Sequence, residues 1–356
     1  MIANCIKCFI LALLILQMNH ALAQELIDKE KLAEEYDELA NKIQRSFILQ
    51  HWSSAKSSLI SMEKFLIENG ETIATPMSLR EVRHRLKDAE KGINFNPEDS
   101  QSASKIIELF AGVDKNCFIG EFDQALQLSK QANKLSFELF GEESYTTICS
   151  SFKLGLTYCE LANYDKAMSV FNRCRVLAIA HAGKKSTLFI HAYDLEIYVS
   201  NLKEEYSNSI VMAKELLSTI ESHKLQISEK YIPLNLQLAT LQNMASDCDS
   251  ALVYAKKGLA AIEKFGSPSA SIHLGLIHEY AEAQAKLKNF EPAAGAYFYL
   301  LEESKKLPNF PADLWVEYLG EYTSVLRNLG KVEEAKKLER EAEQILLSLE
   351  KQKSRS

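Results

Sequence analysis

Residues 144–183 read SYTTICSSFKLGLTYCELANYDKAMSVFNRCRVLAIAHAG, and they carry the strongest structural signal in the chain. Apolar residues recur at helical spacing on both sides of a short break, which predicts two helices, over 144–160 and 164–182. Ser144 is a suitable N-cap for the first helix, and Leu161 to Asn163 form the turn between the two. The stretch is therefore expected to be a helical hairpin.

Small residues are placed where the two helices of this hairpin meet. Gly155 and Ala167 allow a close approach, and the bulky side chains of Leu154, Tyr158 and Phe171 supply the packing around that contact. One hairpin alone leaves an apolar flank in water, and a neighbouring hairpin must cover it. Such units are therefore expected in arrays.

A period of 42 residues extends this pattern along the chain. A small residue in the second helix recurs at Ala125, Ala167, Ser209, Ala251, Ala293 and Ala335. Glycine and proline are scarce, no segment alternates with a period of two, and Glu, Lys, Leu and Ala are abundant, so the chain is predicted to be all-α. A fixed period of this length is typical of stacked supersecondary units, which favours an extended binding surface over a catalytic pocket.

These residues resemble the tetratricopeptide repeat. The match consists of Leu154-Gly155-x-x-Tyr158, then Tyr164-x-x-Ala167, then Phe171. The common tetratricopeptide repeat has about 34 residues. The 42-residue period and the Phe140-Gly141-Glu142-Glu143 loop are instead similar to the kinesin-light-chain-like subtype. The resemblance implies a right-handed α-solenoid of stacked antiparallel helix hairpins.

The expected organisation has four parts: a signal peptide over 1–23, an N-terminal helical capping region over 24–105, six repeats over 106–349, and a basic tail over 350–356. The capping region lies off the period. Trp52 and Ala55 keep the aromatic-x-x-Ala spacing, so a divergent extra hairpin is one alternative for 30–70. Pro76 is expected to open a further helix that ends near Ile93.

The amino-terminal residues predict export. Lys7 precedes the apolar run Cys8 to Leu16, and Ala21-Leu22-Ala23 is a small-x-small cleavage site, which makes Gln24 the first mature residue. The alternative is an uncleaved membrane anchor, but the run is shorter than the ~20 residues that a span needs. No Asn-x-Ser/Thr sequon occurs, which favours a bacterial periplasm over a eukaryotic secretory route. The Ala-Gln junction resembles exported proteins of Bacteroidetes-type bacteria. The mature protein is expected to be periplasmic or secreted, without stable membrane insertion.

Charge and cysteine content exclude several classes of partner and scaffold. The net charge of −7 is spread along the chain and argues against nucleic acid as a partner. The five cysteines after residue 23 are widely spaced and contain no CxxC pair, so a disulfide-built scaffold is not expected. Cys117 and Cys159 occupy one position in adjacent repeats, where the ~10 Å between packed helices is too long for a bridge.

No catalytic or cofactor signature is found. His278-Glu279 begins like a zinc-protease motif, but Glu282 stands where the second histidine is required. His181 and His191 flank a loop that contains Lys184 and Lys185, which fits either an anion or metal site or, as the simpler interpretation, ordinary surface residues. The chain is therefore expected to be no enzyme and to need no cofactor.

The resemblance implies a concave groove lined by the first helix of each repeat. The candidate peptide- or protein-binding residues are Phe110, Cys117, Phe118, Phe152, Leu156, Cys159, Tyr198, Asn201, Leu236, Asn243, His278, Glu282 and Arg327. These candidates are apolar at first and become polar toward the C-terminus, which suits an amphipathic or aromatic-anchored segment. Alternatively, the apolar members fill a tight superhelix or lie under the N-terminal region.

The expected function is that of an exported protein-interaction scaffold or adaptor. One alternative is a sensor whose curvature changes when a peptide or small molecule binds. A second is a non-catalytic subunit of an envelope enzyme complex, or a hydrolase within 24–105, although that region shows no recognisable nucleophile–base set.

Overall fold

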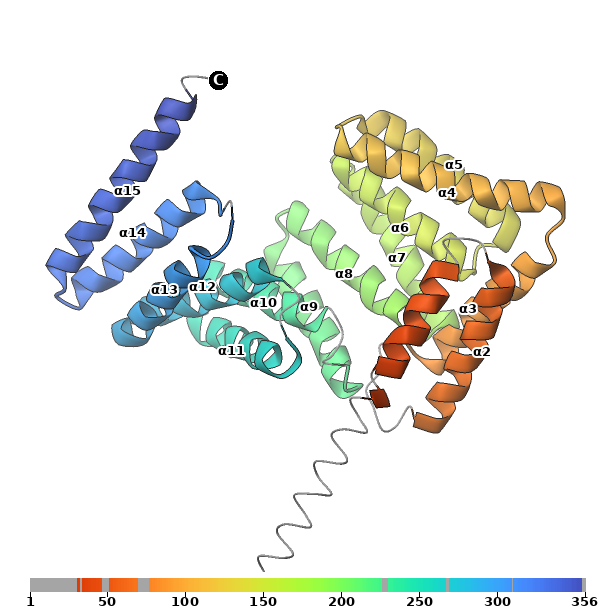
Figure 1. Ribbon diagram of the computed structural model, residues 1–356, viewed down its shortest axis with the longest axis horizontal. Helices are drawn as coiled ribbons and strands as arrows, with labels where there is room; N and C mark the ends of the chain where they lie inside the picture. Colours follow the sequence, from red (N-terminus) through yellow and green to blue (C-terminus); the bar gives the residue numbers. More distant parts are fainter. Residues whose placement is uncertain are drawn as a thin grey trace, which may run out of the picture. The chain divides into compact units, whose positions relative to one another are not determined.

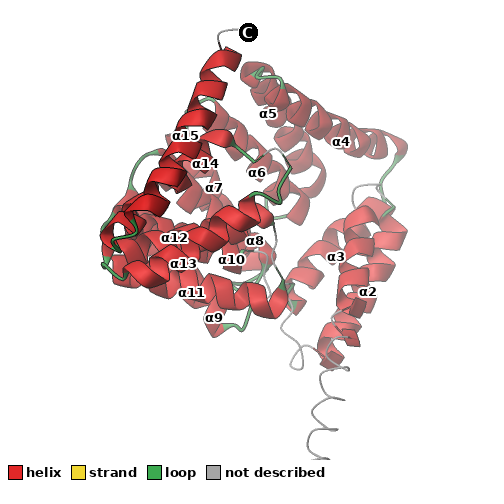
Figure 2. Cartoon of the chain, turned by 60° about the vertical axis from the view of Figure 1, so that its left-hand side comes forward, coloured by secondary structure: helices red, strands yellow, loops and turns green. Residues whose placement is uncertain are grey.

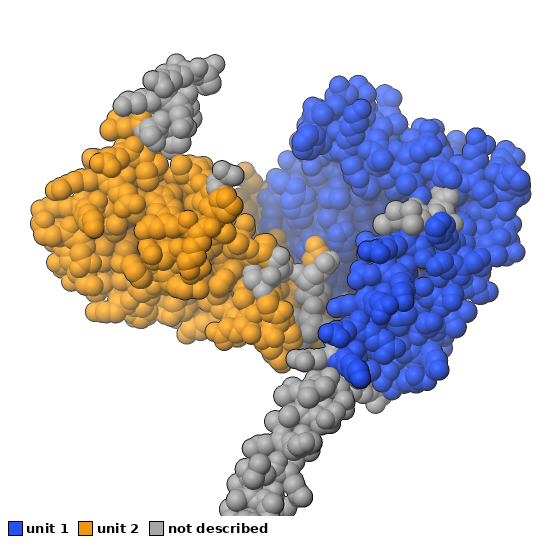
Figure 3. All heavy atoms as spheres, viewed as in Figure 1, with its two compact units in different colours: residues 1–203 blue, residues 204–356 orange. Residues whose placement is uncertain are grey.

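The structure is a computed structural model, and it describes residues 31–32, 34–46, 51–69, 77–225, 230–266, 269–308 and 310–353. Within these residues every regular element is a helix (Figure 2). The predicted signal peptide and the last three residues of the basic tail lie outside the described residues. The chain divides into two compact units, 1–203 and 204–356 (Figure 3). The boundary falls inside the third of the six predicted repeats.

The first unit holds three N-terminal helices and five helices of the repeat array. Residues 34–46 are helical, and the labelled helices that follow are α2 (Trp52–Asn69), α3 (Leu79–Ile93), α4 (Pro97–Phe118), α5 (Phe122–Phe140), α6 (Tyr145–Glu160), α7 (Tyr164–His181) and α8 (Thr187–Leu202). Consecutive helices from α4 to α8 pack against each other as stacked hairpins (Figure 1).

The second unit continues the same alternation. Its helices are α9 (Tyr206–Ser222), α10 (Tyr231–Met244), α11 (Cys248–Phe265), α12 (Ala270–Lys286), α13 (Phe290–Ser304), α14 (Ala312–Asn328) and α15 (Val332–Lys353). We call the first helix of each hairpin (α4, α6, α8, α10, α12, α14) an A helix and the second a B helix. The all-α fold of antiparallel helix hairpins is thus confirmed.

The 42-residue period is a property of the backbone as well as of the sequence. The B helices begin at Phe122, Tyr164, Tyr206, Cys248, Phe290 and Val332, and each start lies 42 residues after the previous one. The turn that precedes each B helix contains one residue in the left-handed region: Gly120, Ala162, Glu204, Ser246, Lys288 and Gly330, with φ between 52° and 79°. This conformation ends the A helix and reverses the chain, as in a Schellman motif.

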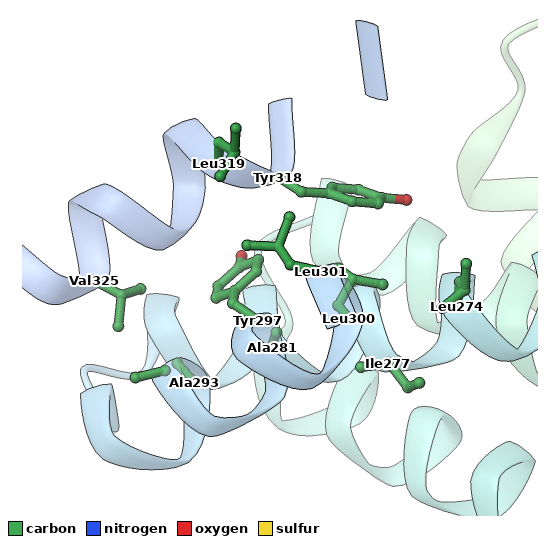
Figure 4. Packing of buried hydrophobic residues seen from close by; sticks show 11 residues of the cluster. Leu274, Ile277, Ala281, Ala293, Tyr297, Leu300, Leu301, Tyr318, Leu319 and Val325 are labelled. Atoms are coloured by element: carbon green, nitrogen blue, oxygen red, sulfur yellow. The ribbon is translucent and has the colours of Figure 1, made fainter. Parts of the chain in front are cut away.

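The recurring small residues lie at the centre of the packing. Ala125, Ala167, Ser209, Ala251, Ala293 and Ala335 are all fully buried. In the second unit, Tyr297 and Leu300 of α13 share one buried core with Tyr318 and Leu319 of α14 (Figure 4). The period thus marks where neighbouring helices touch.

Helix α3 starts later than the sequence predicted and ends where expected. Its first residue is Leu79, because the Ser78 hydroxyl accepts a hydrogen bond from the Glu81 N–H and caps the helix there. Pro76 therefore does not open the helix, and it lies outside the described residues. The helix ends at Ile93, as predicted.

Two buried carboxylates of α3 hold the starts of two A helices. Asp88 Oδ2 accepts hydrogen bonds from the Thr146 backbone N–H at 2.8 Å and from its hydroxyl at 2.7 Å, at the start of α6. Glu81 Oε2 accepts a hydrogen bond from the Thr187 N–H at 2.7 Å, at the start of α8. Negative charge at a helix N-terminus is favourable. Helix α3 therefore fixes these two A helices relative to the N-terminal region.

No helix among the described residues combines the length and the apolar character needed to cross a bilayer.

Candidate functional site: the A-helix faces

The A helices α4, α6 and α8 adjoin through their side chains and form one surface, which we call the unit 1 face. Phe152 of α6 meets His191 of α8 edge-to-face, with ring centroids 4.8 Å apart. Lys153 of α6 forms an ion pair with Asp114 of α4, and its Nζ lies 5.7 Å from the centre of the Phe110 ring. The sequence predicted that these helices line a common surface.

Three of the candidate residues on this face are large, apolar and exposed. Phe118, at the end of α4, has 91% of its surface exposed. Leu156 and Tyr198, which hold the same position in successive repeats, are 37% and 42% exposed. Burial raises the pKa of the Tyr198 phenol, and the nearby Cys159 and Glu160 raise it further, which places Tyr198 beside the end of α6. These residues form an apolar part of the face that a partner can contact.

Other candidates on the same face are packed inside. Phe152 is only 6% exposed, and Cys159 is also buried, whereas Phe110, Cys117 and Asn201 are half-buried. The Oδ1 of Asn201 is buried and has no hydrogen-bond partner within the described part of the chain. Phe152 therefore supports the face through His191, and contact with a ligand falls to its exposed neighbours.

The cysteines in the described residues are free thiols. Burial raises the pKa of Cys159 to about 11, and the carboxylate of Glu160 adds to the shift. The pKa of Cys117 is also raised, by burial and by Glu160 and Asp114. Since the thiolate is the reactive form, both thiols are poor nucleophiles at neutral pH.

The two histidines beside the lysine loop lie in different surroundings. The His181 ring stacks on His84 with centroids 5.6 Å apart, and its Nε2 lies 3.5 Å from a carboxylate oxygen of Glu143. His191 packs against Phe152. Both rings thus pack against other side chains of the first unit.

In the second unit, the A helices are joined by polar bonds. Buried Asn243 of α10 donates through Nδ2 to the carbonyl oxygen and to Oε2 of Glu279 on α12, at 2.9 and 2.8 Å. Leu236 lies against Gly275, where a Cβ would be 3.0 Å from Leu236 Cδ2. Asn243 and Leu236 therefore serve the contact between α10 and α12.

A cluster around His278 bridges α12 and α14. His278 Nε2 lies 2.8 Å from Glu321 Oε2. Although burial lowers the pKa of His278, the hydrogen bond to Glu321 and the carboxylates of Glu279 and Glu282 raise it above the ordinary value. Ligand atoms of His278, Glu279 and Glu282 lie within 4.8 Å of one another, the spacing of a metal site.

The protein's own donors already engage the carboxylates of this cluster. Glu279 Oε1 accepts from the Thr240 hydroxyl at 2.7 Å, and its other oxygen accepts from Asn243. Glu282 forms an ion pair with Lys286 at 2.7 Å. The cluster therefore acts as a polar bridge between A helices.

Arg327 points toward the last helix. Its Nε and Nη2 bond both carboxylate oxygens of Glu339 on α15, at 2.8 to 3.0 Å. The Arg327 side chain is half exposed, and its guanidinium group is already paired with Glu339 of the same chain.

A cavity that sequence reasoning missed lies between the N-terminal helices and the first A helices. It has a volume of about 640 Å³ and is lined by side chains of the 34–46 helix, α2, α3, α4 and α6, and by Phe140 at the end of α5. Its apolar walls are formed mainly by Trp52, Ile106, Ile107, Phe110 and Phe140. Of these, Phe110 was among the candidate binding residues predicted from the sequence.

Trp52 joins the N-terminal hairpin to the first repeat beside this cavity. Its ring centroid lies 6.1 Å from that of Phe95 and 5.8 Å from that of Phe140. The indole also packs against Gly92, where an added Cβ would lie 2.3 Å from the ring. The aromatic-x-x-Ala spacing at Trp52 was a signal for this hairpin, but it did not indicate the cavity.

Comparison with solved structures identifies the fold. The chain is similar to BtubC from P. vanneervenii, with a TM-score of 0.54 and 14% identity over 67% of this chain and 92% of that one. It is also similar to a signal transduction ATPase with numerous domains from Pyrococcus horikoshii that carries a tetratricopeptide repeat sensor, with a TM-score of 0.58 and 16% identity. That match covers 90% of this chain and 46% of the ATPase chain.

No family model matches the chain, and no curated protein matches it. The structural similarity shows that the chain has a tetratricopeptide-like solenoid fold, and at these identities it shows the fold alone.

Proposed function

We propose that this chain is an exported scaffold or adaptor that binds a protein or peptide segment on the unit 1 face and catalyses no reaction. Export is supported by the amino-terminal sequence, in which Lys7, the apolar run Cys8 to Leu16 and the Ala21-Leu22-Ala23 site have the order of a signal peptide. The 42-residue period and its turns support the kinesin-light-chain-like form of the repeat.

The observation that carries the binding proposal is the exposure of Leu156 and Tyr198 at equivalent positions of adjoining A helices. Large apolar side chains usually lie inside a protein, and contiguous exposed ones mark interaction surfaces. Burying their surface against a partner stabilises a complex by roughly 25 cal/mol for each Å² removed from water.

The polar groups beside these residues indicate what kind of segment fits. Asp114 and Lys153 lie on one side of Leu156 in the repeat array, and Glu160 lies beside Tyr198. Such a mixed face suits an amphipathic segment, which places apolar side chains on Leu156 and Tyr198 and polar ones beside the charges. Helices α6 and α8 are held by α3 and by each other, so the face loses little entropy on binding.

The test is affinity capture with the tagged mature chain from the extracytoplasmic fraction of its own cells, followed by binding measurements with the purified partner. N-terminal sequencing of the recovered chain should begin at Gln24. Leu156→Asp and Tyr198→Ala should each weaken the partner's Kd by about tenfold or more, as expected for central anchors.

Val176 provides the matched control, because it is an exposed apolar residue on the B helix α7. Val176→Asp should leave the Kd unchanged. If Val176→Asp weakens binding while folded Leu156→Asp and Tyr198→Ala variants keep it, the partner binds elsewhere and the proposed face is wrong. Recovery of an uncleaved chain from the membrane fraction would contradict cleavage after Ala23.

A further inference from the structure

The 640 Å³ cavity of the first unit has the size and composition of a small-molecule site. Ligand pockets typically measure about 300–1,000 Å³ and combine apolar walls with a few polar groups. Here Trp52 and Phe140 form one wall, and Ile106, Ile107 and Phe110 of α4 form another. The cavity lies between two parts of the unit and shares Phe110, Asp114 and Lys153 with the unit 1 face, but Leu156 and Tyr198 are not among its lining residues.

One polar group stands out at this cavity. The Arg85 side chain is only 11% exposed, and its guanidinium carbon lies 4.0 Å from the centre of the Tyr145 ring. Its Nη2 bonds Glu81 Oε1 at 2.6 Å and the Thr187 hydroxyl at 3.3 Å. Its buried Nε has no hydrogen-bond partner among the described residues.

An arginine in this state has donor capacity that the protein does not use. A buried donor without an acceptor is costly, and an incoming acceptor removes that cost. The guanidinium fork is matched to carboxylate oxygens in particular. A ligand that brings a carboxylate to Arg85 after a small rotation of the side chain would therefore complete its hydrogen bonding.

The charges at the cavity are paired. The charged residues that line it are Arg85, Lys153 and Asp114, and Lys153 forms an ion pair with Asp114. Arg85 pairs with the buried Glu81, whose other oxygen accepts a hydrogen bond from the Thr187 N–H. The site therefore has no net charge once Glu81 is counted, and the unused Nε donor of Arg85 is the feature that favours a carboxylate.

We propose that this cavity binds a small amphipathic carboxylate, with an aliphatic or aromatic body against Trp52 and Phe110 and the carboxylate at Arg85. The inference does not depend on the proposed protein-binding face. Because the cavity walls come from both α3 and the A helices α4 and α6, an occupied cavity links the N-terminal helices to the array.

The chain contains a direct reporter for this site. Trp52 lines the cavity, and the chain's other tryptophan is Trp315 in the second unit. A Trp315→Phe variant leaves Trp52 as the sole indole, and its emission is followed while decanoate, decanol or decylamine is added below the micellar concentration. Decanoate should give a saturable change, decanol should bind at least about tenfold more weakly, and decylamine more weakly still.

Two variants separate the carboxylate contact from the apolar volume. Arg85→Gln should abolish the tenfold preference for decanoate over decanol. Ala111→Phe, on the α4 wall of the cavity, should remove the response to both probes by filling the space. Ala260→Phe, at an exposed position of helix α11, is the matched control and should bind decanoate like the parent. Circular dichroism checks that each variant is folded.

The outcomes distinguish a carboxylate site from non-specific or absent binding and from a site for a peptide C-terminus. Equal affinity for the three probes, or no saturable response in the parent, would overturn the proposal even if Arg85→Gln does not fold. The tripeptide Ala-Ala-Phe with a free C-terminal carboxylate is also tested, and its affinity is compared with that of the same peptide with an amidated C-terminus. If the free-carboxylate peptide binds and decanoate does not, the cavity binds a peptide C-terminus, and the proposed small-molecule ligand is wrong. Loss of decanoate binding in Ala111→Phe, with partner capture intact, would support the cavity independently of the binding face.

Discussion

Gly155 shows how one missing side chain sets the distance between two helices. A Cβ added to Gly155 would lie 2.3 Å from Cε1 of Phe171, which is fully buried on α7. Both were singled out in the sequence as the small and the bulky partner of this contact, and the structure confirms the pairing. The close packing of α6 on α7 thus requires a residue without a Cβ at position 155, and only glycine meets this requirement.

We predict that Gly155→Ala lowers the free energy of unfolding by about 1–2 kcal/mol, because overpacking costs more than the gain in helix propensity. Gly295 on α13 is the control, since nothing lies within 4 Å of an added Cβ there. Gly295→Ala should stabilise by about 0.5–1 kcal/mol. Urea denaturation measures both changes, and a stabilising Gly155→Ala would show that Phe171 can move aside.

For single residues, the sequence predicted the face of the helix on which a side chain lies more accurately than it predicted how exposed that side chain is. Leu156 and Phe152 lie one helical turn apart on α6, and both were assigned to the groove. Leu156 is exposed, whereas Phe152 is covered by His191 of the next repeat. The repeat pattern gives the face on which a residue lies, but its depth of burial depends on the size of the neighbouring side chain one repeat away, which differs from repeat to repeat.

At the scale of the element, α3 is the helix that the sequence could least explain. Its spacing predicted a helix, and its end at Ile93 was correct, but its partners are distant: Thr146 lies 58 residues after Asp88, and Thr187 lies 106 residues after Glu81. Buried carboxylates look like ordinary solvated ones in a sequence. The cavity could not be predicted for the same reason, because the residues that line it are far apart in the sequence and come from five separate helices and the end of a sixth.

Asp88 gives α3 a measurable pH dependence. Burial raises the pKa of Asp88 from 3.8 to about 6, although the hydrogen bonds from Thr146 lower it. Between these two pH values the folded state binds more protons than the unfolded state, so the contribution of Asp88 to stability falls as pH rises from 4 to 6. The full difference amounts to about 3 kcal/mol.

We therefore predict that the stability of the parent relative to Asp88→Asn falls by about 2–3 kcal/mol between pH 4 and pH 6.5. His84 gives a slope of the opposite sign, because burial lowers its pKa, but both proteins contain His84 and the difference cancels it. Thermal unfolding across the pH range measures the effect. A difference that is flat or rises with pH would mean that Asp88 is more hydrated than the structure indicates.

At the scale of the whole molecule, helices pack mainly on their neighbours in sequence. In the second unit, α11 contacts α10 and α12, and α13 contacts α12 and α14. The stability of such an array is close to a sum of local terms, and a local defect opens the neighbouring hairpins first. The array itself was predictable because each period repeats the same burial, with Ala251 and Ala293 as the clearest examples in this unit.

Gly258 allows this locality to be tested. A Cβ at Gly258 on α11 would lie 2.6 Å from Cδ2 of the buried Leu276 on α12. Because α11 and α12 share that contact, Gly258→Leu should speed amide hydrogen exchange in α10 to α13 by tenfold or more, equivalent to about 1.4 kcal/mol of local stability. Gly155→Leu, the matched change in the first unit, should act on α5 to α8 and leave α12 to α15 unchanged. If either variant speeds exchange equally in all helices, the chain unfolds as one cooperative body, and the nearest-neighbour account of its stability is wrong.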